Sequence, residues 1–264
     1  MIVHLYAQCW NDALMLPFFF RHYDVLVDRY FIYDDGSTDG SWELLQAHRK
    51  VDARRFSRTI PESFALSEQV FSDQCWKESR GRADWVIVID LDEHLFHSFG
   101  RAYLTRCRSE GVTVIPALGF QMISEREPTP DNNLCLDFTM GAPWEPMMKI
   151  GIFDPAAITE INFAVGRHTS DPTGRICVPK RDELLLLHYK YMGLEQTHRR
   201  HQELRSRLGS VDIQRGWGHK YSWSVDELRA NWNEHARRAI DTRLFRQDPV
   251  DRYPVRPWWQ KYRE

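Results

Sequence analysis

Apolar runs separated by polar turns divide the first third of the chain into alternating strands and helices. Residues 2–8 (IVHLYAQ) and 29–34 (RYFIYD) are apolar runs of strand length, and runs rich in β-branched and aromatic residues predict strands. Between them, the apolar positions from Leu14 to Val27 suit a helix. A strand, a helix and a further strand in this order are typical of a parallel sheet.

The same alternation continues toward residue 90. After the second strand, the turn GSTDG offers Ser37, Thr38 or Asp39 as the cap of another helix. Beyond it the pattern predicts three elements: a weak strand within residues 54–60, a helix over about 64–79 and a strong strand over 84–90. We therefore expect helices on both faces of the sheet.

The second half of the chain has fewer helical stretches. Strand-like runs occur at residues 111–118, 147–153, 158–165 and 183–189, and helical patterns follow at about 193–208 and 224–246. Strands without helices between them favour mixed pairing. We expect an α/β fold with a Rossmann-like, mixed but mostly parallel sheet flanked by helices. Residues 1–192 would form the core, and residues 193–264 a C-terminal helical extension packed on the same domain.

Composition removes several classes of function. Lysine and arginine total 35 against 37 aspartate and glutamate residues, so no overall field attracts nucleic acid or an anionic membrane. The five cysteines are widely spread and never spaced as CxxC, which argues against a disulfide framework and a thiolate zinc site. The N-terminus has no basic leader, and no apolar run approaches the ~20 residues of a membrane span. A reducing cytoplasm is the expected location.

The stretch WVIVIDLDEH, residues 85–94, joins a buried-looking strand to Asp90, Asp92 and Glu93. Carboxylates beside an apolar run lose hydration and repel one another, so they need a cation. In an extended chain Asp90 and Asp92 project to the same side and could bind one hard divalent ion. The alternative is that one aspartate caps a helix while the others are solvated.

Two further polar clusters follow the first and second strands. QCWND contributes Gln8, Asn11 and Asp12, and YDDGSTDG contributes Asp34 and Asp35. The carboxyl ends of neighbouring strands in an open α/β sheet share one crevice, so these clusters should converge on the acids after the fourth strand. Asp34 or Asp35 could accept hydrogen bonds from a nucleobase and ribose. The alternative is a turn chosen only for its backbone geometry.

A histidine and a basic loop complete the candidate chemistry. His188 ends the run ELLLLH, where it is either a core histidine or, if its strand lies beside the acids, a metal ligand. Lys190, close by, could then bind phosphate. In the loop 215–223 (RGWGHKYSW), His219 and Lys220 could meet a diphosphate, although the loop could equally pack its tryptophans against the core.

Four motifs taken in order resemble the family 2 type glycosyltransferases of the GT-A fold. They are NDALMLPFFFRHY, YFIYDDGSTDGS, DWVIVIDLDEHLF and LLLLHYKYMG. The resemblance covers roughly residues 1–225 and is closest to the branch that is similar to the family 92 enzymes. It implies that Asp90 and Asp92 hold Mn²⁺ or Mg²⁺ on the donor diphosphate, that His188 completes the metal shell, and that Asp34 or Asp35 binds the base.

The implied activity is a metal-dependent transfer of a sugar, with inversion, from a nucleotide-diphosphate sugar to a saccharide or lipid-linked acceptor, and a UDP-sugar is the favoured donor. An inverting transfer needs a base for the acceptor hydroxyl, and the chain lacks the E-D pair of the family 2 pattern. Glu145, beside Trp144, is the first candidate and joins Asp92 as a catalytic residue; Asp137 and Asp171 follow. Lys149 either binds phosphate or pairs with Glu145.

Two segments and two other functions stay open. The helical pattern at 197–208 (THRRHQELRSRL) predicts a solvated face, and the tail 252–263 either packs back on the domain or meets a membrane surface or a second subunit. A peripheral position at the inner membrane face is therefore an alternative to a purely cytoplasmic one. A nucleotidyltransferase would want a phosphate loop after the first strand, which QCWNDALML lacks. A non-catalytic nucleotide-sugar or glycan-binding module is the alternative from another class.

Overall fold

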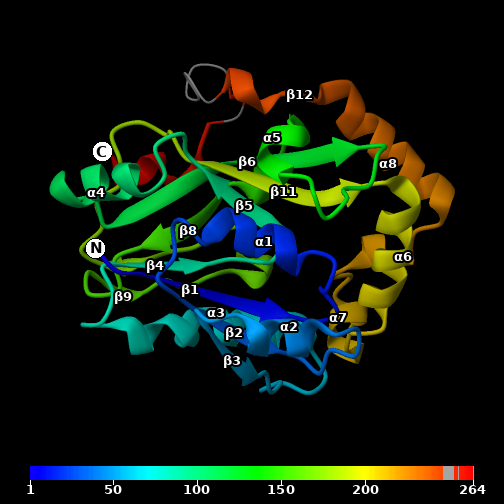
Figure 1. The fold of residues 1–264 in the computed structure, drawn as a ribbon, viewed down its shortest axis with the longest axis horizontal. Helices are drawn as coiled ribbons and strands as arrows, with labels where there is room; N and C mark the ends of the chain where they lie inside the picture. Colours follow the sequence, from blue (N-terminus) through cyan, green and yellow to red (C-terminus); the bar gives the residue numbers. More distant parts are fainter. Residues whose placement is uncertain (246–252, 255, 264) are drawn as a thin grey trace.

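The computed structural model describes residues 1–245, 253–254 and 256–263. Within these residues the chain forms an α/β fold around a ten-stranded mixed sheet flanked by helices (Figure 1). The strand order is β12-β7-β6-β8-β4-β1-β2-β3, and β11 pairs with both β5 and β6. The predicted fold class is confirmed.

The strands have short, defined bounds. They are β1 (Val3–Cys9), β2 (Arg29–Asp34), β3 (Val51–Arg55), β4 (Trp85–Val88), β5 (Glu93–Phe96), β6 (Val114–Ser124), β7 (Met140–Pro143), β8 (Lys149–Phe153), β11 (Leu185–Met192) and β12 (Ile240–Asp241), with β9 (Ile158–Glu160) and β10 (Thr173–Gly174) in a separate pair.

The helices connect these strands or follow them. The α-helices are α1 (Leu16–Tyr23), α2 (Ser41–Ala47), α3 (Phe64–Gln74), α4 (Arg101–Ser109), α5 (Leu134–Asp137), α6 (Leu194–Arg205), α7 (Ser210–Gln214) and α8 (Val225–Arg238). The 3₁₀ turns are η1 (Cys75–Ser79), η2 (Glu145–Met147), η3 (Val165–Arg167), η4 (His219–Ser222), η5 (Thr242–Leu244) and η7 (Trp258–Tyr262). None of the helices in the described residues is long and apolar enough to cross a membrane.

Strand pairing divides the sheet into two regions. The neighbours β4, β1, β2 and β3 are parallel, as the strand and helix alternation predicts. Beyond them β8 runs antiparallel to β4 and β6, while β11 runs parallel to β6 and antiparallel to β5. Strand β5 begins at the residue after Asp92, so the last long strand lies beside the acidic motif.

Alternation along β1 explains why both faces of the sheet are covered. Leu5 and Ala7 face the cluster that contains Phe19 of α1, whereas Tyr6 faces the other side and packs in a cluster with Trp76 of η1. All of these side chains are at most 1% exposed. Full burial of a large apolar side chain contributes about 1.5–3 kcal/mol, so each face stabilises its own layer of helices.

Several element boundaries differ from the sequence prediction. Strand β2 has the predicted bounds, but β3 lies at Val51–Arg55, earlier than expected, because this edge strand is only half-buried and carries a weak apolar pattern. Helix α1 begins only at Leu16, with Pro17 in its first turn, where proline is tolerated. The structure also contains β5, α4 and β7, which the sequence analysis did not predict.

The described part of the tail packs back onto the domain. Trp259 is fully buried, and its indole N–H donates to Asp182, 2.8 Å away. The Arg263 guanidinium pairs with the same carboxylate, and the Trp258 indole donates to the Met148 carbonyl at 2.9 Å. Of the two accounts of the tail, these contacts support the intramolecular one; Arg252 and Val255 lie outside the described residues.

Candidate functional site

The loops after β1 and β2 are joined by hydrogen bonds between side chains and backbone. Asn11 has a left-handed backbone (φ 51°), and its amide oxygen accepts from the Thr38 N–H at 2.8 Å. Its own N–H donates to the Ser37 hydroxyl at 2.9 Å, and the Asp12 N–H donates to the Ser41 hydroxyl at 2.9 Å. The loops after β1 and β2 therefore meet, and a crevice shared with the acids after β4 stays a prediction.

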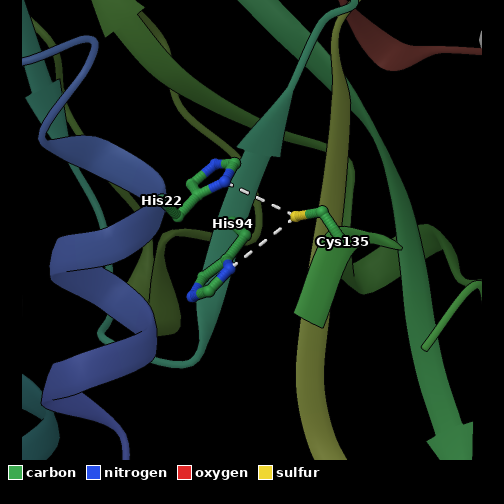
Figure 2. A group of neighbouring side chains, drawn as sticks. All are labelled: His22, His94 and Cys135. Atoms are coloured by element: carbon green, nitrogen blue, oxygen red, sulfur yellow. Dashed lines mark hydrogen bonds between the residues drawn. The ribbon is translucent and has the colours of Figure 1, made fainter. Parts of the chain in front are cut away.

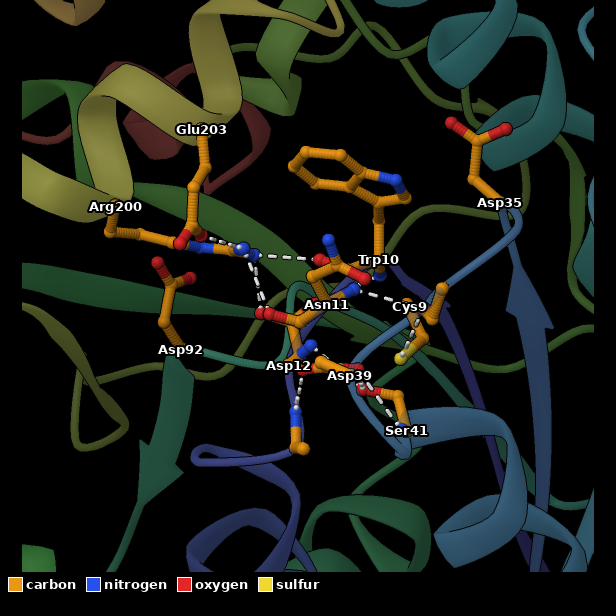
Figure 3. Close-up of polar contacts among 12 residues, drawn as sticks. Cys9, Trp10, Asn11, Asp12, Asp35, Asp39, Ser41, Asp92, Arg200 and Glu203 are labelled. Atoms are coloured by element: carbon orange, nitrogen blue, oxygen red, sulfur yellow. Dashed lines mark hydrogen bonds and ion pairs between the residues drawn. The ribbon is translucent and has the colours of Figure 1, made fainter.

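Helix α6 closes over the loop after β1 (Figure 3). The Arg200 guanidinium donates to the carbonyls of Trp10 and Asn11, each at 2.8 Å, and pairs with the Asp12 carboxylate at 2.6 Å. Figure 1 shows α6 at the edge of the sheet toward which β1 points. The prediction of a solvated face for this segment is therefore wrong at Arg200, because its guanidinium binds two half-buried carbonyls and a carboxylate.

A second arginine of the same segment also points inward. Arg207 is 10% exposed, pairs with Asp35 at 2.8 Å and lies over the Trp10 ring at 4.9 Å. Arg200 lies within α6, whereas Arg207 lies in the turn that follows Arg205, the last residue of that helix. The charge pattern of the segment had pointed to solvent, so neither inward contact was predicted.

The two acids after β2 have different surroundings. Asp34 is 0% exposed; its carboxylate accepts from the N–H groups of Gly36 and Ser37 and pairs with Arg55. Asp34 therefore fixes the turn and has no surface for a nucleotide, which corrects its assignment as a donor contact. Asp35 is 14% exposed and pairs with Arg58 at 3.2 Å as well as with Arg207. Asp35 stays a predicted contact of the base or ribose.

The acidic motif after β4 forms a turn. The Glu93 N–H donates to the Asp90 carbonyl at 3.1 Å, so residues 90–93 are not extended. The expectation that alternation directs Asp90 and Asp92 to one side is therefore wrong in its premise. Asp90 pairs with Arg167 at 2.6 Å, although 48% of its side chain stays exposed. The role of Asp90 as a metal ligand stays a prediction.

Arg167 of η3 is the buried cation of this motif, and the sequence analysis missed it. Its side chain is 3% exposed and contacts Asp90, Glu93 and Glu68, while it donates to the Val88 carbonyl at 2.7 Å. Its backbone has a positive φ of 56°, which is strained for a residue with a Cβ. No local pattern linked Arg167 to a motif far away in the sequence.

Lys149 is a structural residue and not an exposed donor contact. Its side chain is 3% exposed and its ammonium pairs with Glu93, which is 1% exposed, at 2.5 Å. Burial alone would raise the pKa of Glu93, but the charges of Lys149 and Arg167 lower it below its usual value. The predictions that Lys149 binds donor phosphate or pairs with Glu145 are thereby corrected, because its only carboxylate partner among the described residues is Glu93.

Asp92 faces the histidine that the sequence analysis selected. His188 of β11 lies opposite Glu93 of β5 and Gln121 of β6, so the strand does return beside the acids, which was the condition for the second of the two interpretations of His188. The Asp92 carboxylate lies 3.4 Å from His188 Nε2. His188 is therefore not an isolated core histidine.

Hydrogen bonds determine the tautomer of a neutral His188, and thereby which ring nitrogen presents a lone pair to Asp92. The Gln121 amide N–H₂ donates to the carbonyls of Met122 and His188, so its oxygen accepts from His188 Nδ1–H at 2.8 Å. Nε2 is then the free nitrogen, and a proton or a metal ion must lie between it and the carboxylate. Burial would raise the pKa of Asp92, but His188 and Lys190 hold it far below its usual value.

Two lysines adjoin this pair. The Lys190 ammonium lies 3.2 Å from the Tyr221 hydroxyl, and Lys220 lies over the rings of Trp144 and Trp223 at 5.1 and 5.2 Å. Neither lysine forms an ion pair with a carboxylate in the part of the chain that the structure describes. Burial, and then the charge of Lys190, lowers the pKa of Lys220. Adjacent like charges without a counter-ion are typical of an anion site.

Two other predicted residues are Gln8, near the end of β1, and Glu145, which follows Trp144. The Gln8 side-chain amide is buried, and neither its nitrogen nor its oxygen has a hydrogen-bond partner among the described residues. Glu145 is exposed at the start of η2 and follows Trp144, whose ring lies 5.9 Å from that of His188. We call Gln8, Asp12, Asp92, His188, Lys190 and Lys220 the strand-end site.

The remaining candidates are engaged elsewhere or are exposed. Asp137 accepts hydrogen bonds from Asn132 and Asn133, and Asp171, 79% exposed, pairs with Lys261. His219 is exposed on η4. Neither of the two alternative bases shows a contact with the strand-end site.

One group of three potential metal ligands stands out, and it is not the predicted one. Among the described residues, only His22, His94 and Cys135 bring three such atoms within 4.8 Å of one another. Of the three predicted metal ligands, Asp92 and His188 lie 3.4 Å apart, whereas Asp90 pairs with Arg167.

Comparison with known proteins gives structural neighbours only. No protein-family model and no curated protein sequence matches the chain. Residues 1–349 of TarS from S. aureus align at 8% identity and a TM-score of 0.40, over 80% of this chain and 68% of that one. The longer TarS structure aligns at 11% identity and a TM-score of 0.42, over 88% of this chain and 43% of that one. The complex of TarS 1–349 with UDP-GlcNAc aligns at 10% identity and a TM-score of 0.37, over 80% and 69%.

Proposed function

We propose that this protein is a glycosyltransferase that takes its sugar from a nucleotide-diphosphate sugar and uses a divalent cation held by Asp92 and His188. The observation that carries the proposal is this pair, in which Asp92 lies in the turn between β4 and β5 and His188 lies within β11. Lys190 and Lys220 lie beside it and have no ion pairs among the described residues. A cation and a diphosphate together would neutralise this set of charges.

The donor atoms fit a metal ion. Gln121 holds the Nδ1–H of His188, which leaves Nε2 as a ligand, and such outer hydrogen bonds commonly orient metal-bound imidazoles. A set of one nitrogen and one carboxylate favours Mn²⁺ over Mg²⁺, because Mg²⁺ prefers oxygen ligands and retains water. When bound, the ion would stabilise the negative charge of the departing nucleoside diphosphate.

The positive side of the site suits the diphosphate. Lys190 is half-buried, and although burial would lower its pKa, Tyr221 and Asp92 raise it, so this ammonium keeps its charge. Lys220 faces the same region from η4, after Gly218, whose φ is 69°. Both ammonium groups would bind diphosphate oxygens, and His219 of the same turn would lie at the rim. Charge stabilisation of this kind is a large part of catalysis by transferases.

The nucleoside end is assigned to the loops after β1 and β2. Gln8 has an unpaired buried amide, a group that costs free energy unless a ligand binds it. Asp35 is a carboxylate for ribose or base, and Asn11 and Asp12 hold the loop shape from which these groups project. A UDP-sugar is the donor that we favour.

The acceptor is assigned to the side of Trp144. A half-buried indole stacks well on a sugar face, and Glu145, the next residue, is an exposed carboxylate without a hydrogen bond from the described residues. Glu145 would remove the proton of the acceptor hydroxyl as it attacks the sugar from the face opposite the diphosphate, which inverts the anomeric centre. The acceptor class is a saccharide or a lipid-linked saccharide.

The experiment incubates the protein with Mn²⁺ and a panel of UDP-sugars and acceptors and measures release of UDP, together with UDP binding by calorimetry. Asp92→Asn and His188→Ala should lose the Mn²⁺-dependent part of UDP affinity, whereas Asp171→Asn, at an exposed acid, should keep it. Unchanged affinity in Asp92→Asn would reject the site. Tight Mn²⁺-dependent binding without turnover of any donor would favour the non-catalytic binding module.

A further inference from the structure

A second group of side chains, His22, His94 and Cys135, converges behind the acidic motif and has no part in the proposed transfer. His22 comes from α1, His94 from β5 and Cys135 from α5, and Figure 2 shows both imidazoles directed at the sulfur. Cys135 Sγ lies 3.5 Å from His22 Nδ1 and 3.9 Å from His94 Nδ1. His94 and Cys135 are 1% and 3% exposed.

The hydrogen bonds of His22 leave the correct nitrogen free. Its Nε2 lies 2.8 Å from the Leu95 carbonyl oxygen, which can only accept, so Nε2 carries the proton. Nδ1 therefore presents a lone pair to the sulfur. A neutral ring with its proton on Nε2 is the form that metal binding requires.

His94 is held in a costly environment. Its ring stacks on His22 with 4.6 Å between centroids and contacts Phe19, Tyr23 and Tyr189 edge-on. The Nε2 atom of His94 has no hydrogen-bond partner among the described residues. The one polar contact of the ring in that part of the chain is between Nδ1 and the sulfur of Cys135. A polar ring enclosed by aromatic side chains costs free energy unless a ligand compensates it.

The two sulfur-to-nitrogen distances are close to those of a tetrahedral metal site, and all three atoms lie within 4.8 Å of one another. With Zn–S near 2.3 Å and Zn–N near 2.0–2.1 Å, a tetrahedral angle separates sulfur and nitrogen by about 3.5–3.6 Å. The His22 distance of 3.5 Å equals this value, and the His94 distance of 3.9 Å exceeds it by a few tenths of an ångström. A cavity of about 10 Å³ lined by both histidines and by Asn132 adjoins the group, which is room for about one water molecule as a fourth ligand.

We propose that His22, His94 and Cys135 bind a borderline-soft divalent cation, with Zn²⁺ as the first candidate, as a structural brace. The Cys135 thiol would release its proton to solvent on binding, and the ion would accept lone pairs from sulfur and from both Nδ1 atoms. It would tie α1 and α5 to β5, the strand that begins directly after Asp92. Because the three ligands lie far apart in the sequence, no short motif such as CxxC predicted this site.

The test uses Co²⁺, which reports thiolate ligation by a sulfur-to-metal charge-transfer band in the near ultraviolet. Reduced, chelator-treated full-length protein is titrated with Co²⁺ and then with Zn²⁺, and the Tm is measured in parallel. The band should saturate at one Co²⁺ per chain and disappear when Zn²⁺ is added, and Zn²⁺ should raise the Tm.

The variants separate this site from other cysteines and from the strand-end site. Cys135→Ser should abolish the band and His22→Gln should weaken Co²⁺ affinity at least tenfold. Cys107→Ser, at another buried cysteine, and Asp92→Asn should retain the band. Absence of the band in the wild type at excess Co²⁺, or an unchanged band in Cys135→Ser or His22→Gln, would overturn the proposal.

Discussion

At the scale of single residues, the three acids after β4 differ in which positively charged side chains they pair with. Their position beside a buried strand correctly indicated that they need cations, but the chain itself supplies most of them. Arg167 pairs with Asp90, and Lys149 and Arg167 pair with Glu93. Asp92 has only a histidine as its close cationic partner in the described residues. The acid that has no ion pair with a lysine or arginine among the described residues is therefore the one that we assign to the metal ion.

The pair of Lys149 and Glu93 gives the first prediction. Lys149→Met should lower the free energy of unfolding by about 3–5 kcal/mol, because it leaves a buried carboxylate with too little positive charge. The double variant Lys149→Met with Glu93→Gln should recover a part of that loss, since the uncompensated charge is removed. Urea unfolding of the wild type, both single variants and the double variant measures the coupling. Strictly additive losses would contradict the pairing.

Gln8 gives the second prediction, because its buried amide is unpaired in the described structure. Gln8→Leu removes an unsatisfied polar group, so the free energy of unfolding should stay within about 1 kcal/mol of the wild type or rise. UDP affinity should nevertheless fall about tenfold, the loss expected for one buried hydrogen-bonding group. Calorimetry with UDP and Mn²⁺ measures the affinity.

The control for Gln8 is Gln46→Leu, at an exposed glutamine of α2. This variant should leave UDP affinity unchanged. If Gln8→Leu also binds UDP like the wild type, the amide at the end of β1 does not contact the nucleotide, and its burial needs another explanation.

At the scale of elements, regular strands and helices could be predicted from the sequence, and the geometry of turns could not. Strand β2 and the existence of a strand at β11 follow from apolar runs of strand length, although the position of β11 beside the acidic motif had been left open. The turn at residues 90–93 does not, because the alternation rule assumes an extended chain and says nothing of where a strand stops. The inward face of α6 was also missed, since an arginine that caps carbonyls and one that is solvated have the same sequence pattern.

Arg200 of α6 gives the third prediction. Arg200→Ala removes the donors to the Trp10 and Asn11 carbonyls and the partner of Asp12. Hydrogen bonds that involve a charged group contribute about 1.5–3 kcal/mol, so stability should fall by that amount. Amide hydrogen exchange in the loop after β1 should accelerate, and UDP affinity should decrease with it.

Arg199→Ala on the same helix is the matched control. Arg199 is 65% exposed, and its nearest carboxylate, Glu127, is 4.0 Å away. An exposed pair of this kind contributes about 0–1 kcal/mol, so neither stability nor loop exchange should change appreciably. Equal effects of the two substitutions would show that α6 acts through overall helix stability and not through the Arg200 contacts.

At the scale of the whole molecule, the fold assembles its site from distant parts of the chain. Gln8 and Asp12 come from the first strand and its loop, Asp92 from the fourth, and His188 and Lys220 from the last third. These residues could be selected from the sequence because each lies in or shortly after an apolar run of strand length, or, for Lys220, in a glycine-flanked basic loop. It could not find Arg167 or the group around Cys135, since only tertiary contacts bring their partners together.

The fourth prediction concerns stability against pH and rests on His201 and His235, which are 2% and 4% exposed and whose Nδ1 atoms have no hydrogen-bond partner among the described residues. Burial, and then nearby lysine charges, lowers the pKa of His201 to about 3 and that of His235 to about 4. In the unfolded chain each should titrate near 6.5. Below that pH the unfolded state binds protons that the folded state excludes, so stability is complete above about pH 6.5 and falls toward pH 4.

The slope of the free energy of unfolding against pH reports how many protons the buried histidines exclude. Each excluded proton should contribute up to about 1.4 kcal/mol per pH unit, measured as the free energy of unfolding in urea between pH 7 and 4.5. Because the carboxylates contribute the same background in every variant, His235→Gln should reduce the slope by close to one proton, while His219→Gln, at an exposed histidine, should not change it. The His235 ring lies edge-on to that of Trp144, with 5.6 Å between centroids. A slope in His235→Gln equal to that of the wild type would mean that the buried ring takes up its proton without unfolding, and its packing against Trp144 would then have to be more open than this contact indicates.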